Sequence, residues 1–90
     1  MYFVYLIKCE NPKNSKISYY CGYTNNPNRR FREHTTGNGA KYTKSHLPLE
    51  MRVIDRFESR KKAMRNEIKI KKRSKSYKVK LFRKSNSSIS

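Results

Sequence analysis

The stretch MYFVYLIKCENPKNSKISYYCGY, residues 1–23, decides the fold of this chain. Residues 2–9 are rich in aromatic and β-branched side chains, which predicts a strand. Its apolar residues barely alternate, which indicates burial on both faces. Residues 10–18 are rich in turn-forming residues, and 19–23 predict a second strand. We therefore expect a β-hairpin with a long loop.

Helices are expected to follow the hairpin. Pro27 suits the first position of a helix, and Asn26 before it suits the cap. Ser59 suits the cap of a later helix, on which apolar residues recur at helical spacing. The predicted elements are a helix over 27–34 that stops near Gly37, an irregular basic loop over 40–48, a half-buried strand over 49–57, a helix over 60–72 and a short helix over 77–82.

This order, β-β-α-β-α-α, predicts an α+β fold with a small three-stranded antiparallel sheet packed by helices. A length of 90 residues suits one domain with a thin core. We expect the domain to cover residues 1–83 and residues 84–90 to form a disordered polar tail.

The charge of the chain indicates a polyanionic partner. It has 23 Lys and Arg against 6 Asp and Glu, a formal net charge of +17. Folding does not need such an excess, whereas binding phosphates would relieve the self-repulsion. The sequence has no amphipathic helix that bears Trp and no apolar run of about 20 residues, so it does not favour a membrane partner. We therefore expect a nucleic-acid partner, no membrane, and an intracellular location, in the cytoplasm with the nucleoid or in the nucleus.

The two cysteines predict no disulfide framework. Cys9 and Cys21 are too few, and wrongly spaced, for a zinc site of the Cys or Cys/His type. They are interpreted as reduced strand residues that are partly buried.

Glu67 is the acidic residue that stands out. Its neighbours along the predicted helix turn the carboxylate toward the core, where it needs a cation or a metal as partner. A single carboxylate can hold Mg²⁺ when water and a substrate phosphate complete the shell. The alternative is an ordinary ion pair with Lys71 at i+4. The apolar or small residues predicted to share its face are Ala63, Met64, Ile68 and Ile70.

Arg30 and His34 form a second candidate pair. They lie four residues apart on one predicted helix and so project from the same face. A guanidinium matches two phosphate oxygens, and a histidine can move a proton near neutral pH. The alternative is a solvated basic face, because Arg29 and Arg32 are also basic.

The seven tyrosines supply a third group of candidates. Tyr5 and Tyr20 fall on the two strands of the hairpin and are expected to project toward the same site. Near a metal and an arginine, the pKa of a tyrosine could fall from about 10 far enough to accept a proton from water. The alternative is that both tyrosines only build the sheet.

Taken together, these residues resemble the GIY-YIG nuclease domain. Residues 3–5, Phe-Val-Tyr, stand where that family has Gly-Ile-Tyr, and residues 20–22, Tyr-Cys-Gly, stand where it has Tyr-Ile-Gly. Arg30 follows Gly22 by eight positions, as the family's catalytic arginine does. His34 matches a histidine found one turn later, and Glu67 matches the metal-binding glutamate.

The resemblance covers about residues 2–82. Residues 39–43, Gly-Ala-Lys-Tyr-Thr, are similar to a segment shared by compact stand-alone members and branched-DNA nucleases. It implies a metal-dependent DNA endonuclease, structure-specific or weakly sequence-specific, that hydrolyses phosphodiester bonds in DNA repair or recombination. The main alternative is a non-catalytic, basic nucleic-acid-binding protein on the same scaffold.

The resemblance also implies roles for individual residues. One Mg²⁺ or Mn²⁺ ion would bind Glu67, Arg30 would stabilise the phosphate, and Tyr5 or Tyr20, helped by His34, would accept a proton from water. A targeting subunit is a further possible partner. The residues expected to hold the DNA backbone are Arg29, Lys41, Tyr42, Lys44, Lys71 and Lys72.

Overall fold

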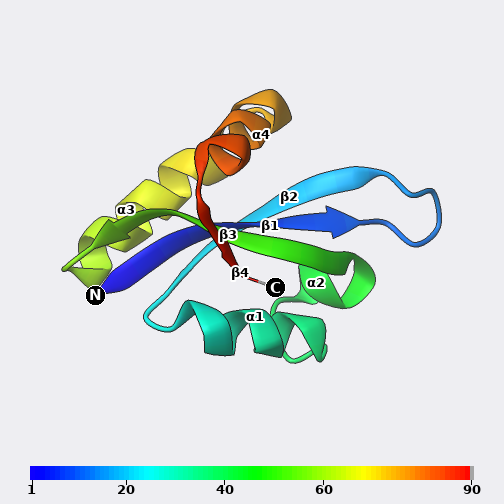
Figure 1. Cartoon of the computed structure of the whole chain (residues 1–90), viewed down its shortest axis with the longest axis horizontal. Coiled ribbons are helices and arrows are strands. Elements are labelled where there is room, and N and C mark those ends of the chain that lie inside the picture. Colours follow the sequence, from blue (N-terminus) through cyan, green and yellow to red (C-terminus); the bar gives the residue numbers. More distant parts are fainter. Residues whose placement is uncertain (90) are drawn as a thin grey trace.

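A four-stranded antiparallel sheet in the order β2-β1-β3-β4 forms the centre of the computed structural model, which describes residues 1–89. Helices α3 and α4 lie on one side of the sheet, and α1 and α2 lie on the other (Figure 1). The strands are β1 (Tyr2–Glu10), β2 (Ile17–Thr24), β3 (Leu47–Phe57) and β4 (Ser87–Ile89). The helices are α1 (Pro27–Thr35), α2 (Lys41–Ser45), α3 (Arg60–Lys71) and α4 (Lys75–Lys84).

Strand β1 is buried on both faces, which confirms the prediction made from its unbroken apolar run. It pairs with β2 on one side and with β3 on the other. Because side chains alternate along a strand, β1 feeds two separate cores. The core under α3 and α4 contains Val4, Leu6, Cys21, Ala63, Ile70 and Phe82. The core over α1 contains Tyr5, Ile7, Cys9, Phe31 and Met51.

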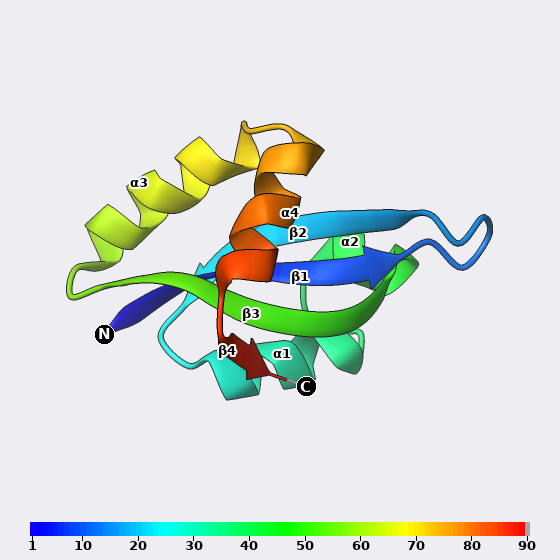
Figure 2. The same cartoon turned by 45° about the horizontal axis from the view of Figure 1, so that its top comes forward.

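The predicted caps and turns hold. The Asn26 side chain accepts a hydrogen bond from the Arg29 backbone N–H at 3.1 Å, and the Ser59 side chain accepts one from the Lys62 N–H at 3.4 Å. The predicted hairpin also forms, and its loop extends beyond the body of the molecule (Figure 2). Cys9 and Cys21 are free thiols, as expected, although both are fully buried.

The predicted sheet was one strand short. Residues 87–89, which fall in the predicted disordered tail, form β4 and pair with residues 51–53 of β3. Their serine-rich sequence carries no strand pattern, and tertiary contacts fix them instead. The Arg52 guanidinium donates to the carbonyl oxygens of Phe82 at 2.9 Å and Ser85 at 3.3 Å, which holds the end of α4 against β3. Ser90 lies outside the described residues, and the boundary at 83/84 stays a prediction.

Two further predictions are corrected. The segment 40–48, expected to be irregular, contains α2 and the start of β3. On α3, Met64 and Ile68 were expected to face the core but are exposed. Helix α3 lies over β1 and the edge strand β2, so only a narrow stripe that includes Ala63 and Ile70 is buried. No helix within residues 1–89 has the length and apolar character of a membrane span.

Candidate active site

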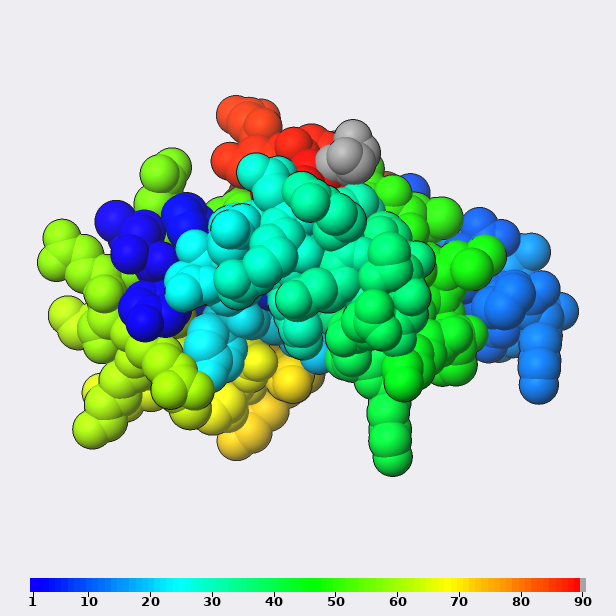
Figure 3. Space-filling view, turned by 90° about the horizontal axis from the view of Figure 1, so that it is seen from below, coloured from blue at the N-terminus to red at the C-terminus, as the bar shows by residue number. Residues whose placement is uncertain are grey.

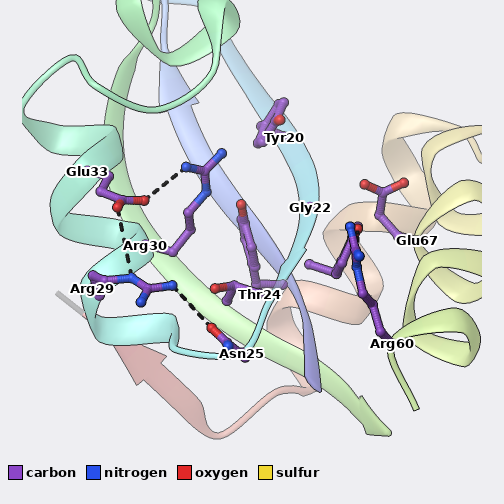
Figure 4. A pocket seen from close by; sticks show the side chains of 11 residues that line it. Tyr20, Gly22, Thr24, Asn25, Arg29, Arg30, Glu33, Arg60 and Glu67 are labelled. Atoms are coloured by element: carbon purple, nitrogen blue, oxygen red, sulfur yellow. Dashed lines mark hydrogen bonds and ion pairs between the residues drawn. The ribbon is translucent and has the colours of Figure 1, made fainter. Parts of the chain in front are cut away.

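A cavity of about 400 Å³ opens at the edge strand β2, and residues of α1 and α3, from opposite faces of the sheet, line it. Figure 4 shows Arg30 and Glu33 of α1 on one side of β2 and Glu67 of α3 on the other. We call these two sides the α1 wall and the α3 wall. The lining residues are Tyr5, Tyr20, Gly22, Tyr23, Thr24, Asn25, Arg29, Arg30, Glu33, Arg60 and Glu67.

Gly22 lets the Tyr5 ring cross the edge of the sheet. The two residues are cross-strand partners in the β1–β2 ladder. A Cβ at Gly22 would lie 2.6 Å from the Tyr5 Cζ atom, much closer than two carbon atoms can approach. The glycine of the Tyr-x-Gly stretch is therefore required by the packing of the tyrosine on the neighbouring strand.

A buried hydrogen-bond chain orients the Tyr5 hydroxyl. The His34 Nε2 atom lies 2.9 Å from the Tyr5 hydroxyl, and His34 Nδ1 lies 2.8 Å from Thr43 Oγ1. Thr43 donates its only hydroxyl proton to the Ala40 carbonyl at 3.0 Å. His34 Nδ1 must therefore be the donor to Thr43, which leaves Nε2 as the acceptor of the Tyr5 proton.

Burial holds this chain in its neutral form. His34 is only 1% exposed, and burial, followed by the nearby Arg30 charge, lowers the pKa of His34 to about 4. Burial raises the pKa of Tyr5, and Arg30 only partly opposes it. The tyrosine is thus a neutral donor in the free protein. The lower pKa expected beside a bound metal stays a prediction. His34 lies behind the cavity wall and does not line it.

Arg30 is held by a residue that the sequence interpretation missed. Its Nη1 atom donates to Glu33 Oε1 at 2.9 Å, and this hydrogen bond lowers the pKa of Glu33. Arg29 is similarly fixed, because its Nη2 atom donates to Asn25 Oδ1 at 3.1 Å. The i, i+3 spacing from Arg30 to Glu33 is the signal that could have revealed the pair.

The α3 wall is more weakly held. The Glu67 side chain is 12% exposed and lines the cavity, as expected of the candidate metal residue. The alternative expectation is met as well, because Lys71 Nζ lies 3.6 Å from Glu67 Oε2. The same ammonium lies over the Tyr20 ring, 5.7 Å from its centre. Lys71 therefore contacts both the Glu67 carboxylate and the Tyr20 ring.

Tyr20 is held by a stack of rings. The Tyr42 ring stacks on it at 5.7 Å between centres, and the His46 ring lies parallel to Tyr42 at 4.1 Å. The Tyr42 hydroxyl also donates to Ser18 Oγ, which ties α2 to β2. Tyr42, predicted to hold DNA, thus supports a wall of the cavity instead of lining it.

The remaining predicted residues divide between the cavity and the surface around it. Arg29 lines the cavity, whereas Lys41, Lys44 and Lys72 are exposed and do not. The sequence interpretation missed Arg60 and Tyr23, which line the cavity and lie together, the Arg60 Nε atom donating to the Tyr23 hydroxyl at 3.3 Å. No sequence signal links these two residues, because only the packing of α3 on β2 brings them together.

The donor set suits one hard divalent cation that keeps most of its waters. Among residues 1–89 no three His, Cys, Asp or Glu side chains gather into a metal-binding group. Glu67 offers one carboxylate in a cavity with room for water and a phosphate. Mg²⁺ is commonly bound by one or two carboxylates, with water and phosphate oxygens as its other ligands.

Comparisons with known proteins show the family to which the chain belongs. The model of the GIY-YIG catalytic domain matches residues 1–81. A UPF0213 protein of Halobacterium salinarum is 43% identical over 82 residues, 91% of this chain and 100% of its own length. A UPF0213 protein of Neisseria meningitidis is 45% identical over 77% of this chain and 70% of its own. One of Oceanobacillus iheyensis is 38% identical over 90% and 88%. No solved structure matches the chain. The chain therefore belongs to the GIY-YIG catalytic domain family, which is a family of nucleases.

Proposed function

We propose that this protein is a metal-dependent endonuclease that hydrolyses phosphodiester bonds in DNA. The observation that carries the proposal is that Arg30, Tyr5 and Glu67, from three different elements, line one cavity. They offer a phosphate-binding cation, a proton-accepting oxygen and a metal-binding carboxylate, which are the groups that this hydrolysis needs.

Arg30 would stabilise the negative charge that grows on the phosphate in the transition state. Its hydrogen bond to Glu33 fixes the guanidinium before the substrate binds, so little reorganisation is needed. Glu67 would hold one Mg²⁺ or Mn²⁺ ion, which would supply Lewis-acid chemistry at the phosphate.

Tyr5 and His34 would carry the proton from the attacking water. The water gives a proton to the Tyr5 oxygen while the Tyr5 proton moves to His34 Nε2, the acceptor in the buried chain. The hydroxide forms a bond to phosphorus, the bond to the 3′ oxygen breaks, and that oxygen takes a proton from solvent. His34, with a pKa of about 4, is neutral at neutral pH, so its Nε2 atom has a free lone pair. The same low pKa means that His34 would hold the proton only briefly before losing it. Tyr20 is the competing candidate for the base.

The basic surface would hold the DNA backbone without reading its bases. A net charge of +17 favours strong, salt-sensitive binding to phosphates. Recognition by backbone contacts fits a structure-specific or weakly sequence-specific nuclease in repair or recombination. It also fits a protein that works beside DNA, in the cytoplasm or nucleus, alone or with a targeting subunit.

A non-catalytic nucleic-acid-binding protein is the second candidate. The observation in its favour is the Glu67–Lys71 ion pair, which satisfies the carboxylate without a metal. The two candidates differ in whether the protein breaks phosphodiester bonds.

The test is cleavage of a panel of labelled linear, nicked, flapped and junction DNAs in Mg²⁺ and in EDTA. We expect cleavage only with the metal, and Arg30→Ala and Glu67→Gln to lower the rate by at least about 10²-fold. Arg32→Ala and Glu58→Gln are matched controls, because neither residue lines the cavity. DNA binding should survive in all four variants.

Two outcomes contradict the enzyme. The first is that no DNA of the panel is cut in Mg²⁺ or Mn²⁺ by a protein that binds it. The second is that the highly purified Arg30→Ala, Glu67→Gln double variant cuts at the wild-type rate.

The variants Tyr5→Phe and Tyr20→Phe identify the base, because loss of the base should lower the cleavage rate by about 10²-fold or more.

A further inference from the structure

Two large apolar side chains lie exposed on α3, a strongly basic helix. Met64 is 38% exposed and Ile68 is 48% exposed, and they are one turn apart on α3. Side chains one turn apart are neighbours on a helix surface. They therefore form one apolar patch, which we call the α3 shoulder.

The α3 shoulder adjoins the cavity. At about 100° per residue, Met64 lies roughly 60° around the helix from Glu67, and Ile68 lies beyond it on the same side. Arg60 and Glu67, on this side of α3, line the cavity, whereas Asn66 lines a different pocket on the opposite side. In Figure 3 the yellow-green side chains of α3 project from one side of the molecule. A substrate bound in the cavity would thus extend over the shoulder.

The charge around the α3 shoulder indicates which kind of partner binds it. Helix α3 carries six Lys and Arg residues and one acidic residue, Glu67. Two copies of this helix placed face to face would bring twelve basic side chains together, so a second copy is a poor partner. A polyanion is attracted by the same charges, but phosphates gain nothing from Met and Ile. The partner must therefore offer apolar faces as well as phosphates.

We propose that the α3 shoulder packs against an unstacked base step next to the phosphate bound in the cavity. Its ligand class is DNA whose helix is interrupted close to the cleavage position, such as a nick, flap or mismatch. Apolar side chains that enter a base step do so most readily where stacking is already weak, because less stacking energy is then lost. The proposal rests on the proposed function, since it names the substrate of the same cavity.

The test measures binding in EDTA, where no cleavage occurs. Two duplexes of one sequence, nicked and continuous, carry the fluorescent base 2-aminopurine beside the nick position. We expect the wild-type protein to bind the nicked duplex about tenfold more tightly and to raise its fluorescence through unstacking. The double variant Met64→Gln, Ile68→Gln should bind the two duplexes within about twofold of each other and leave the fluorescence unchanged.

The double variant Leu47→Gln, Leu49→Gln is the matched control, because these side chains are 52% and 43% exposed on β3. It should keep both the preference and the fluorescence change. A second shoulder variant, Met64→Ala, Ile68→Ala, has high helix propensity and should behave like the glutamine pair.

Retention of the preference in both shoulder variants overturns the proposal, as does unchanged fluorescence with the wild-type protein. Self-association in sedimentation that both shoulder variants abolish also overturns it, in favour of a second copy. The proposed function is judged separately, by cleavage in Mg²⁺. If the protein cuts DNA but causes no fluorescence change, only the base-step proposal for the α3 shoulder is wrong. If it causes the fluorescence change but never cuts DNA, only the proposed nuclease activity is wrong.

Discussion

The two walls of the cavity differ in how firmly their charged groups are held. On the α1 wall, Arg30 donates to Glu33 at 2.9 Å, and the Tyr5 hydroxyl contacts a fully buried histidine. On the α3 wall, Glu67 has only a looser ion pair, at 3.6 Å, to the half-exposed side chain of Lys71. One wall is fixed before anything binds, and the other can rearrange.

This difference suits the two tasks that we propose for the walls. Groups that stabilise a transition state work best when they are already oriented, because no reorganisation then opposes the reaction. A carboxylate that receives a metal must instead exchange one cation for another. The Lys71 ammonium lies 3.6 Å from the Glu67 carboxylate on a side chain that is about half exposed, so an incoming divalent cation can replace it.

The sharpest way to break the fixed wall is Gly22→Ala. The added Cβ meets the Tyr5 ring, so the free energy of unfolding should fall by about 1–3 kcal/mol. Cleavage should fall by about 10²-fold, since a displacement of about 1 Å in a catalytic group has that effect. Chemical denaturation and single-turnover cleavage measure the two changes.

Gly37→Ala is the matched control for Gly22→Ala. Gly37 has φ +83°, and nothing lies within 4 Å of a Cβ placed there. The substitution should cost about 1–2 kcal/mol of stability through backbone strain while leaving the rate of the folded protein unchanged. Equal losses of rate in the two variants would show that Tyr5 packing does not govern activity.

The pH dependence of stability tests the buried chain at a smaller scale. His34 has a folded-state pKa of about 4, below its ordinary value of 6.5, so the unfolded chain takes up the proton first. Its contribution is complete above pH 6.5 and should be lost as the pH falls toward 4, by about 3 kcal/mol.

The measurement is the free energy of unfolding of the wild type and of His34→Gln between pH 7 and pH 4. The variant should be less stable at pH 7 and should lack most of the decline between pH 6.5 and pH 5. Glu33 and Glu50, whose pKa values are lowered by hydrogen bonds to Arg30 and Ser88 respectively, lose their contributions only at lower pH. An identical decline in both proteins would disprove the neutral, buried histidine.

The smallest expected effect is on the adjustable wall. Lys71→Gln removes the competitor of the metal at Glu67, so the Mg²⁺ concentration for half-maximal cleavage should fall by about two- to fivefold. The slope of log DNA affinity against log salt concentration should become smaller by about 1, which corresponds to the loss of one phosphate contact. Lys72→Gln is the control, an exposed neighbour for which no ion pair forms within residues 1–89. If both variants change the Mg²⁺ dependence equally, Lys71 does not compete at Glu67.

Much of the fold followed from local patterns. The unbroken apolar run of β1 predicted burial on both faces, and Asn26, Pro27 and Ser59 predicted where α1 and α3 begin. β4 did not follow, because a Ser-rich segment has no pattern of its own. Tertiary contacts hold it, including those of Arg52 with the end of α4 and of Ser88 with Glu50. The exposure of Met64 and Ile68 did not follow either. Helical spacing predicts which residues share one face of α3, but it does not predict how much of that face the sheet covers.

The sequence by itself determined the hairpin, the caps, the positive charge and the residue types of the candidate site, because these depend on neighbours in the chain. Tertiary structure alone decided that Arg30 and Glu67, which belong to helices on opposite faces of the sheet, meet around one edge strand at Gly22. It also decided that His34 is buried, with its Nε2 atom against the Tyr5 hydroxyl. The reason is physical: burial and the approach of distant elements set the charge state and direction of a side chain, and neither is encoded at its own position.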